Sequence, residues 1–377
     1  MYDVALIGIG SMGSAAAYYL SKQGLRILGL DQFQPPHSFG SHAGDSRVIR
    51  KAYFEHPDYV PLLAQSYKNW NELERISGLK LFHKSGLLYI GDSNDFLLNG
   101  VKNSAEKYQL DIETEDISVS PSFSNLDNKQ FLLEPNAGFV LPERTIQSYI
   151  DLAVQQGADF QFGEKLTYWE KLDNGYLLVT NKHQYHTKKI VFTAGAYIKE
   201  LLPDVKIPLT VTKQSMFWFE PKHARLFQKE EFPCWFISDA HWSGIFYGFP
   251  SLYNLERKAP LVKIGHHCTG VKVSEPDGEQ EVSLKDQKNM KQFVDKYFKG
   301  AFRSYMQMST CYYTMSKDEH FIVDYIKEHD QNVILATGFS GHGFKFAPMM
   351  GEVIADLVIH GKTDMPIEFL SLSRFSS

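Results

Sequence analysis

The chain has 377 residues, of which 43% are hydrophobic and 22% charged, and 39 Lys and Arg against 44 Asp and Glu give a net charge of -5. At about 150 residues per domain this length predicts two or three domains with a sizeable core, and the lack of a basic excess argues against a nucleic-acid partner. The three cysteines, Cys234, Cys268 and Cys311, are too few for a disulfide framework or a cysteine-rich zinc site, so we expect no metal and a reducing cytoplasm.

The apolar start of the chain is not expected to be a signal peptide or a membrane span. No Lys or Arg precedes the apolar run, Asp3 lies inside it, and three glycines interrupt it. No later stretch reaches the ~18 uninterrupted apolar residues that a span needs. We therefore expect no membrane association.

A glycine-rich turn at residues 8–13 is the first sign of a nucleotide site. It follows an apolar strand predicted at residues 4–7 and opens a helix, as in the pattern G-x-G-x-x-G. A second strand predicted at residues 25–30 ends at Asp31. The helix is supported by apolar residues at helical spacing, followed by a glycine at the C-cap position: Met12, Ala15, Ala16, Tyr19, Leu20 and Gly24.

Each residue of this turn has a physical task in binding a dinucleotide. Gly8 permits the tight turn, Gly10 lets a pyrophosphate approach the backbone, and Gly13 lets helix and strand pack closely. Asp31 is placed to accept hydrogen bonds from an adenosine ribose, and its charge disfavours the 2'-phosphate of NADP. The alternative is a strand–helix–strand unit that binds nothing.

These residues alone leave NAD and FAD open. Residues 189–195 and 332–338 each run from an apolar strand into a small residue and a glycine. In FAD enzymes that begin in this way, such strands close the same sheet far along the chain. A helix after the second strand is predicted from apolar spacing and a final glycine: Met350, Val353, Ile354, Leu357, Val358 and Gly361.

The middle of the chain predicts a second domain built on a mainly antiparallel sheet. Three stretches rich in β-branched and aromatic residues are predicted as its strands, at residues 213–219, 244–249 and 261–266. Residues 283–297 are expected to form a solvated surface helix. We assign residues 1–82, 143–211 and 317–377 to a Rossmann-like α/β nucleotide domain, and residues 83–142 and 212–316 to the substrate domain.

The third predicted strand places two groups with chemical potential on one face. Because strand side chains alternate, Lys263, Gly265 and His267 share one face, and Val262, Ile264 and His266 share the other. A cation beside an imidazole suggests a functional face. An exposed polar face is the alternative on this pattern alone.

Seven segments that occur in one order show a resemblance to a known family. They are the opening G-x-G-x-x-G with Asp31, and residues 40–50 (GSHAGDSRVIR), 247–250 (YGFP), 263–267 (KIGHH), 311–314 (CYYT), 318–322 (DEHFI) and 338–346 (GFSGHGFKF). Together they resemble the monomeric sarcosine oxidase and N-methyltryptophan oxidase family of FAD-dependent amine oxidases. The ending at residues 371–375 (SLSRF) favours the N-methyltryptophan oxidase branch.

The resemblance implies an FAD cofactor attached covalently. Cys311 matches the cysteine that forms a thioether with the flavin, and nearby cations such as Arg47 and His42 are expected to lower the pKa of its thiol or to polarise the flavin. The residues implied in cofactor binding are Gly8, Gly10, Ser11, Met12, Gly13, Asp31, Ser41, His42, Arg47, Ala194, Gly195, Cys311, Gly341, Gly343, Phe344 and Lys345.

The resemblance also implies a substrate site and an oxygen site. Arg50 and Lys345 match the pair that binds a substrate carboxylate. Tyr313 and Tyr247 match aromatic residues of the cavity wall. Catalytic roles fall to Lys263, which activates oxygen in this family, and to His267, Arg47 and Tyr313 near the flavin.

The sequence departs from the family pattern at one position. The family usually has two histidines before Gly44, and the second is Ala43 here. This change puts the flavin's potential and covalent attachment in question. Cys268, beside His267, has no counterpart, and the pair lacks two more ligands at a spacing that would bind a metal.

The predicted activity is oxidation of an N-methyl or other secondary amino acid. The imine is hydrolysed to the amino acid and formaldehyde, and dioxygen is reduced to hydrogen peroxide; no general-base carboxylate stands out. A cyclic imino acid or a glycated amino acid is an alternative substrate, and an FAD dehydrogenase or a flavin-binding redox module is an alternative function. The expected partners are a small secondary amino acid and dioxygen, bound by a monomer.

Overall fold

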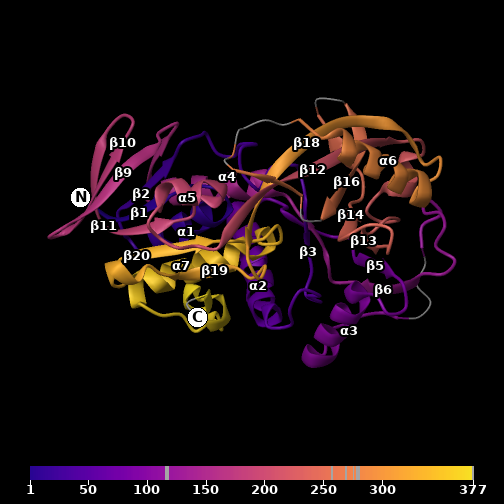
Figure 1. The fold of residues 1–377 in the computed structure, drawn as a ribbon, viewed down its shortest axis with the longest axis horizontal. Helices are drawn as coiled ribbons and strands as arrows, with labels where there is room; N and C mark the ends of the chain where they lie inside the picture. The colour runs from indigo at the N-terminus through magenta and orange to yellow at the C-terminus, as the bar shows by residue number, and fades with distance from the viewer. Residues whose placement is uncertain (115–118, 256–257, 268–269, 275, 277–280, 376–377) are drawn as a thin grey trace.

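The computed structural model describes residues 1–114, 119–255, 258–267, 270–274, 276 and 281–375, and it contains two large sheets side by side (Figure 1). The first sheet has eight strands in the order β19-β20-β11-β1-β2-β8, with β10 and β9 paired beside β11. Its strands are β1 (Tyr2–Ile7), β2 (Ile27–Asp31), β8 (Asp159–Phe162), β9 (Leu166–Leu172), β10 (Gly175–Thr180), β11 (Gln184–Phe192), β19 (Ile322–Tyr325) and β20 (Val333–Thr337).

Strands from distant parts of the chain meet in this sheet, as predicted. β20, β11, β1, β2 and β8 run parallel to their neighbours, while β19, β10 and β9 pair antiparallel. Of the two glycine-ended strands, β11 pairs with β1 and β20 pairs with β11. The result is a Rossmann-like α/β sheet.

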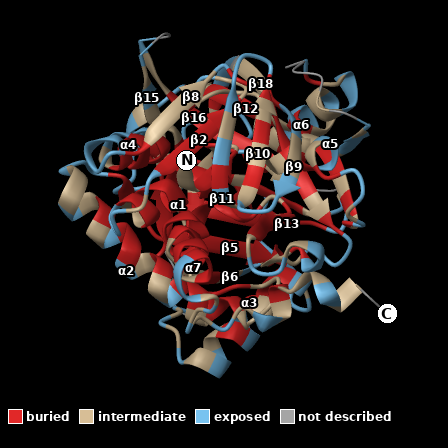
Figure 2. Ribbon diagram, turned by 90° about the vertical axis from the view of Figure 1, so that its left-hand side faces the viewer, coloured by how far each residue is buried: buried red, intermediate tan, exposed pale blue. Residues whose placement is uncertain are grey.

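Helices cover one face of the first sheet, and the β9–β10 hairpin covers the other. Alternation along β1 turns Val4 and Leu6 toward the helices, and Ala5 and Ile7 toward the hairpin. Figure 2 shows the buried residues of α1 and α7 packed together. The helices that contribute to this core are α1 (Ser11–Ser21), α2 (Tyr59–Ser77), α4 (Pro142–Gln155) and α7 (Ala347–His360).

The second sheet has nine strands and is mainly antiparallel, as predicted; of its pairs, β13 and β5 are parallel. Its order is β17-β12-β16-β14-β13-β5-β6, with β18 beside β12 and β15 beside β16. Its strands are β5 (Leu87–Gly91), β6 (Gln130–Glu134), β12 (Leu209–Pro221), β13 (Cys234–Ser238), β14 (Ile245–Gly248), β15 (Leu252–Asn254), β16 (Ala259–His267), β17 (Val271–Val273) and β18 (Phe302–Ser316).

One helix of the second domain differs from its prediction. α6 (Leu284–Tyr297) is not a purely solvated helix, because Met290, Phe293 and Tyr297 are buried against the second sheet. The ring of Phe293 stacks on Phe246 of β14 at 3.8 Å between centroids. The charged residues that dominate the sequence of α6 therefore cover only its outer face.

A small sheet and two further helices complete the architecture. The three-stranded sheet has the order β3-β7-β4, from β3 (Arg47–Ile49), β4 (Phe82–Lys84) and β7 (Gly138–Val140). Of the two helices, α3 (Phe96–Tyr108) packs on the second sheet and α5 (Ile198–Leu201) near β9. None of the helices within the described ranges is long and apolar enough to cross a membrane. The domain boundaries stay a prediction.

Candidate active site

A large cavity is lined by residues of both large sheets. It brings together Gly8, Gly10, Ser11, Met12, Asp31, Ser41, His42, Arg47, Arg50, Ala194, Gly195, Tyr247, His267, Tyr313, Gly341, Gly343, Phe344 and Lys345. Three other predicted site residues, Gly13, Lys263 and Cys311, do not line it. Most of the predicted site residues thus share one cavity although they come from segments far apart in the chain.

The glycine-rich turn has the geometry that a bound dinucleotide requires. Gly8 has φ of 96°, and a Cβ there would lie 2.7 Å from Ala194 Cα. A Cβ on Gly13 would lie 2.0 Å from Gly8 O, so this glycine lets α1 approach β1. The two side-chain oxygens of Asp31 accept the N–H groups of Ile9 (2.8 Å) and Phe33 (2.9 Å). These bonds fix the carboxylate at the end of β2.

The cavity also contains a buried polar atom that lacks a partner among the described residues. Thr314 Oγ1 is buried and has no hydrogen-bond partner among the described residues, and Thr314 lines the cavity. Buried polar groups are normally paired. A glycine-rich turn and this hydroxyl in one cavity fit a nucleotide with a polar ring system, as FAD has.

The two predicted carboxylate-binding cations lie in the same cavity, and one of them is already paired. Arg50 is 2% exposed, and its Nη2 lies 2.6 Å from both carboxylate oxygens of Glu55. Lys345 Nζ donates to His342 O over 2.7 Å. Glu55 also lines the cavity. The sequence reasoning missed this residue, although it expected only that no carboxylate would stand out as a general base.

Burial and charge set the protonation of these three groups. Burial lowers the pKa of Lys345 to about 7, and the charge of Arg50 adds to this, while Glu55 opposes it. Burial alone would raise the pKa of Glu55, but Arg50, His342 and Lys345 lower it to about 2. Glu55 is therefore ionised at neutral pH and is a weak base.

Tyr53 and His342 lie directly beside the pair. Tyr53 is fully buried, and its ring faces the guanidinium of Arg50 at 4.3 Å and Lys345 Nζ at 5.1 Å. Its hydroxyl contacts His342 Nδ1. Because His342 Nε2 lies 3.1 Å from the carbonyl of Glu319, the ring carries its proton there and accepts from Tyr53. Burial lowers the pKa of His342 to about 3, so the ring is neutral.

The alternation predicted along β16 is observed. Lys263 and His267 lie on the cavity side, where Lys263 Nζ is 5.1 Å from the ring of Phe249, a cavity residue, and His267 lines the cavity. His266 lies on the opposite side, stacked on Phe246 at 4.0 Å between centroids. Burial lowers the pKa of His267 to about 4, and its Nδ1 lies 3.3 Å from the Tyr313 hydroxyl.

Lys263 is buried behind residues 44–46 instead of on the cavity surface. It is 3% exposed, and its Nζ donates to Gly44 O (2.5 Å) and Ser46 O (2.9 Å). Burial and the nearby charge of Arg47 lower its pKa well below the usual value. Arg47 lines the cavity and donates to the carbonyls of Ser41 (2.9 Å), Ala43 (2.7 Å) and Ser46 (2.8 Å).

Cys311 is buried on β18, next to both cations. Burial raises the pKa of its thiol, and the charges of Arg47 and Lys263 lower it only in part. The expectation that His42 acts as a nearby cation is wrong: burial, with His37 and Arg47, lowers the pKa of His42 to about 3, so the ring is neutral. Cys268 lies outside the described residues.

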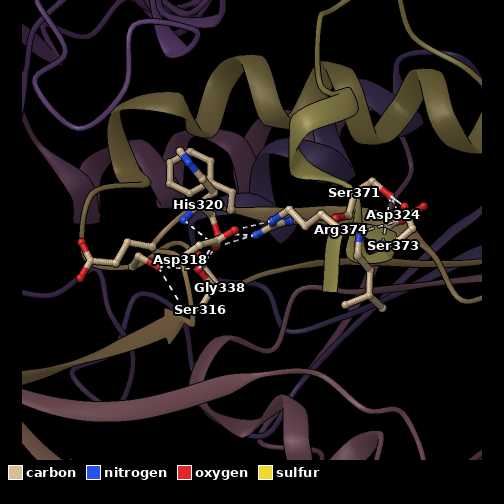
Figure 3. Close-up of polar contacts among 12 residues, drawn as sticks. Ser316, Asp318, His320, Asp324, Gly338, Ser371, Ser373 and Arg374 are labelled. Carbon is tan, nitrogen blue, oxygen red and sulfur yellow. Dashed lines mark hydrogen bonds and ion pairs between the residues drawn. The ribbon is translucent and has the colours of Figure 1, made fainter. Parts of the chain in front are cut away.

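The turn after β18 contacts the C-terminal segment through Arg374 (Figure 3). Arg374 donates from Nε to Asp318 Oδ2 (2.8 Å) and from Nη2 to the carbonyl of His320 (3.0 Å). Ser340 Oγ accepts the N–H of Ser316 over 3.1 Å and donates to Gly338 O over 3.0 Å. The turn after β18 thus links the C-terminal segment to the cavity wall.

Comparison with known proteins identifies the class to which this fold and cavity belong. Residues 3–357 match the family described as FAD dependent oxidoreductase, and the chain belongs to that family. It is 35% identical to monomeric sarcosine oxidase of Streptomyces avermitilis over 100% of this chain and 98% of that protein. It is 32% identical to N-methyl-L-tryptophan oxidase of Salmonella dublin over 100% of this chain and 99% of that protein.

Solved structures with the same fold extend beyond these relatives. NikD, an amino acid oxidase, matches with a TM-score of 0.85 and 21% identity over 98% of this chain and 97% of that chain. L-proline dehydrogenase from P. horikoshii matches with a TM-score of 0.84 and 20% identity over 100% and 98%. At this identity the likeness concerns the fold.

Proposed function

We propose that the protein is an FAD-dependent oxidase of secondary amino acids, chiefly N-methyl amino acids. The observation that carries the proposal is the pair of buried cations, Arg50 and Lys345, in the cavity that also contains the glycine-rich turn. A guanidinium binds a carboxylate in a two-pronged fashion, and an ammonium adds a second charge. The names of the relatives, which act on sarcosine and N-methyl-L-tryptophan, support the same substrate class.

In this proposal, residues from both large sheets hold FAD. The N–H groups at the start of α1 would bind the pyrophosphate, Asp31 would accept from the ribose, and Cys311 on β18 would form the thioether. Bound FAD supplies the two-electron oxidation of the substrate C–N bond to an imine, which water hydrolyses, and it passes the electrons to dioxygen to give hydrogen peroxide.

The substrate carboxylate takes the place of Glu55 at Arg50 in this proposal. Glu55 has a pKa of about 2, so it acts through its charge and not as a base. His267 and His342 are neutral. The amine is therefore oxidised in its neutral form, which the two cations favour by lowering the amine pKa.

An apolar wall of the cavity lies next to Arg50 and limits the size and polarity of the substrate's remaining groups. It is formed by Phe54, Phe236, Ile245, Tyr247 and Phe249. A charged substituent loses its hydration against the apolar side chains of this wall. We therefore propose substrates with small, aliphatic or aromatic substituents.

Lys263 and Arg47 supply positive charge to the oxygen step. Two of the three N–H donors of Lys263 bind carbonyls, which leaves a third donor for dioxygen or for a water molecule. A preorganised cation stabilises the negative charge that develops as dioxygen accepts electrons. Lys263→Met should slow reoxidation by on the order of a hundredfold or more, with anaerobic reduction nearly unchanged in stopped-flow traces.

A peroxide assay over a panel of amines tests the proposal. Sarcosine, N-methyltryptophan, proline, a glycated amino acid and an N-methylamine without a carboxylate are compared in the protein and in Arg50→Ala. The variant should lose about 2 to 5 kcal/mol of binding for carboxylate substrates, with little change for the simple amine. Equal losses for both would assign Arg50 to the flavin or the fold.

The same assay separates the alternative functions. Turnover with an artificial acceptor but not with dioxygen would indicate a dehydrogenase. A colourless protein without turnover would indicate a binding module.

We further propose that the enzyme acts as a monomer in the cytoplasm. Cys234 and Cys311 are both free and buried, which fits a reducing compartment. Sedimentation of the holoenzyme at two concentrations tests the monomer, because a dimer would sediment at twice the mass.

A further inference from the structure

The turn that binds Lys263 has a rare conformation. Ser46 N donates to Gly44 O over 2.7 Å, which closes a three-residue turn. Its central residue, Asp45, has φ of 66°, and Gly44 before it has φ of 114°. A three-residue turn with positive φ at a residue that carries a Cβ is strained, and it persists where neighbouring groups hold it.

Glu143, near the start of α4, stabilises this turn. Its Oε1 accepts the N–H of Gly44 (2.7 Å) and the N–H of Asp45 (3.2 Å). Two consecutive N–H groups turned toward one anion form an anion-binding nest, and the N-terminus of a helix favours a negative side chain. The carboxylate thus fixes the two peptide units of the strained turn.

The same turn supplies the two carbonyls that bind Lys263. Gly44 O and Ser46 O replace water around an ammonium ion that is 3% exposed. A buried cation needs such partners, so its place depends on where these carbonyls point. Two contacts made by other residues also hold the turn: Trp218 Nε1 donates to Asp45 Oδ2 (2.9 Å), and Arg47 donates to Ser46 O (2.8 Å).

We propose that Glu143 is a positioning residue for Lys263, which it orients by holding the 44–46 turn without touching the lysine. The proposal rests on the role proposed above for Lys263 in the oxygen step. The charge of Glu143 also acts on Lys263 and on Arg47, and it favours the protonated form of both.

The kinetic test compares Glu143→Ala and Glu143→Gln in the holoenzyme. Glu143→Ala should slow reoxidation by on the order of 10- to 100-fold and leave anaerobic reduction within about twofold of the parent. Glu143→Gln keeps an oxygen that accepts both N–H groups, so its loss should be smaller. Asp151→Asn, which removes an exposed carboxylate from the same helix, should change neither step.

The decisive comparison places the same change in the Lys263→Met background. If Glu143 acts through Lys263, Glu143→Ala should add less than about a twofold loss there. An equal loss in both backgrounds, or no loss with Lys263 present, would overturn the proposal. If Lys263→Met impairs reduction instead of reoxidation, the proposed oxygen role is wrong. In that case a positioning role for Glu143 would still require Glu143→Ala to impair reduction.

A thermal double-mutant cycle gives a readout that does not depend on turnover. Glu143→Ala should lower the melting temperature of the holoenzyme more when Lys263 is present than when it is Met, because only the lysine needs the carbonyls. Equal decreases in both backgrounds would contradict the proposal.

The pH profile of reoxidation adds a third readout. Loss of the Glu143 charge should shift the alkaline fall in reoxidation rate to lower pH in Glu143→Gln. A purely structural role would leave the profile unchanged.

Discussion

Cys311 shows how burial and charge oppose each other at a single residue. Burial raises the pKa of its thiol, and the charges of Arg47 and Lys263 offset only part of that rise. Little thiolate is therefore present at neutral pH in the protein's own field. The covalent attachment proposed above would therefore depend on activation of the flavin methyl group more than on a low thiol pKa.

The first prediction concerns this attachment. Cys311→Ala should release its flavin on acid precipitation, whereas the parent protein should keep it. The variant should still fold and bind FAD without a covalent bond, because the turn at Gly8 and Asp31 are unchanged. Absorbance of the supernatant at the flavin maximum measures the release. Acid-stable flavin in the variant would place the link at another residue.

The second prediction concerns the proton of Lys345. Its pKa of about 7 in the folded protein lies below the usual value of 10.5, so its charge is lost as the pH rises through about 7. His342, His267 and Glu55, which surround the site, keep their charge states there because their pKa values are about 3, 4 and 2. A carboxylate ligand should bind most tightly below pH 7 and weaken by up to about tenfold per pH unit above it.

Titration of the holoenzyme with acetate at several pH values measures this dependence. Lys345→Arg is the matched control, because a guanidinium stays protonated, and its acetate affinity should be nearly constant between about pH 6 and pH 9. The same slope in the parent and in Lys345→Arg would show that another group titrates.

At the scale of elements, close packing of α1 on α7 depends on a single glycine. A Cβ on Gly351 would lie 2.7 Å from both the Cβ and the carbonyl carbon of Ala15. Glycine inside a helix is otherwise unfavourable by about 1 kcal/mol relative to alanine. Its presence in α7 is explained by the short distance between the two helices.

The third prediction sets these two effects against each other. Gly351→Ala gains helix propensity but forces a backbone shift, which costs typically about 1 to 3 kcal/mol in a packed core. We expect the overpacking to prevail and the melting temperature to fall. Ala15→Gly in the same chain removes one of the clashing atoms and should recover part of the loss. A Gly351→Ala variant more stable than the parent would refute this account of the interface.

Sequence patterns predicted the elements whose periodicity is clear in the chain, namely β1, β2, β11, β12, β14, β16, β20, α1, α6 and α7. Others, such as α2, α3, α4 and β18, were not predicted. The parallel strands, the antiparallel strands and the helix before Gly361 follow from runs of apolar residues and turn glycines. The buried face of α6 was missed because charged residues outnumber Met290, Phe293 and Tyr297, which contact the sheet. A helix that is polar on average still buries one stripe.

Sequence reasoning about the site succeeded where residues fall within recognisable segments and failed for pairings across space. Arg50 and Lys345 were placed in one cavity through the family resemblance. Glu55 was missed because an irregular segment separates it from Arg50 and no periodicity shows which way its side chain points. Glu143 meets Gly44 across 99 positions of the chain, a contact that a single sequence does not encode in any local pattern.

At the scale of the molecule, the cavity connects the two large sheets. Its wall contains Asp31 at the end of β2 in the first sheet and Tyr247 on β14 in the second. The long strand β18 pairs along β12 and contributes Tyr313 and Thr314 to the same cavity. A ligand that fills this cavity therefore contacts both halves.

The fourth prediction follows from the order of strands in the first sheet. A chain that ends at residue 331 lacks β20 and α7, which cover one side of β11 and one face of α1. It should bind no FAD and should be degraded quickly in limited proteolysis, although the turn at Gly8 and Asp31 is intact. Flavin retained at a stoichiometry near one after gel filtration would show that the turn binds FAD without the complete sheet.

The place of β1 in its sheet also affects synthesis of the protein. β1 leaves the ribosome before the other strands of its sheet, yet one of its two neighbours, β11, begins at Gln184, and β20 follows only at Val333. The nascent chain thus exposes an unpaired apolar strand edge through much of translation, and such edges promote aggregation. Production of the enzyme should therefore depend on chaperones that bind the early chain, and slower translation at lower temperature should raise the yield of folded protein.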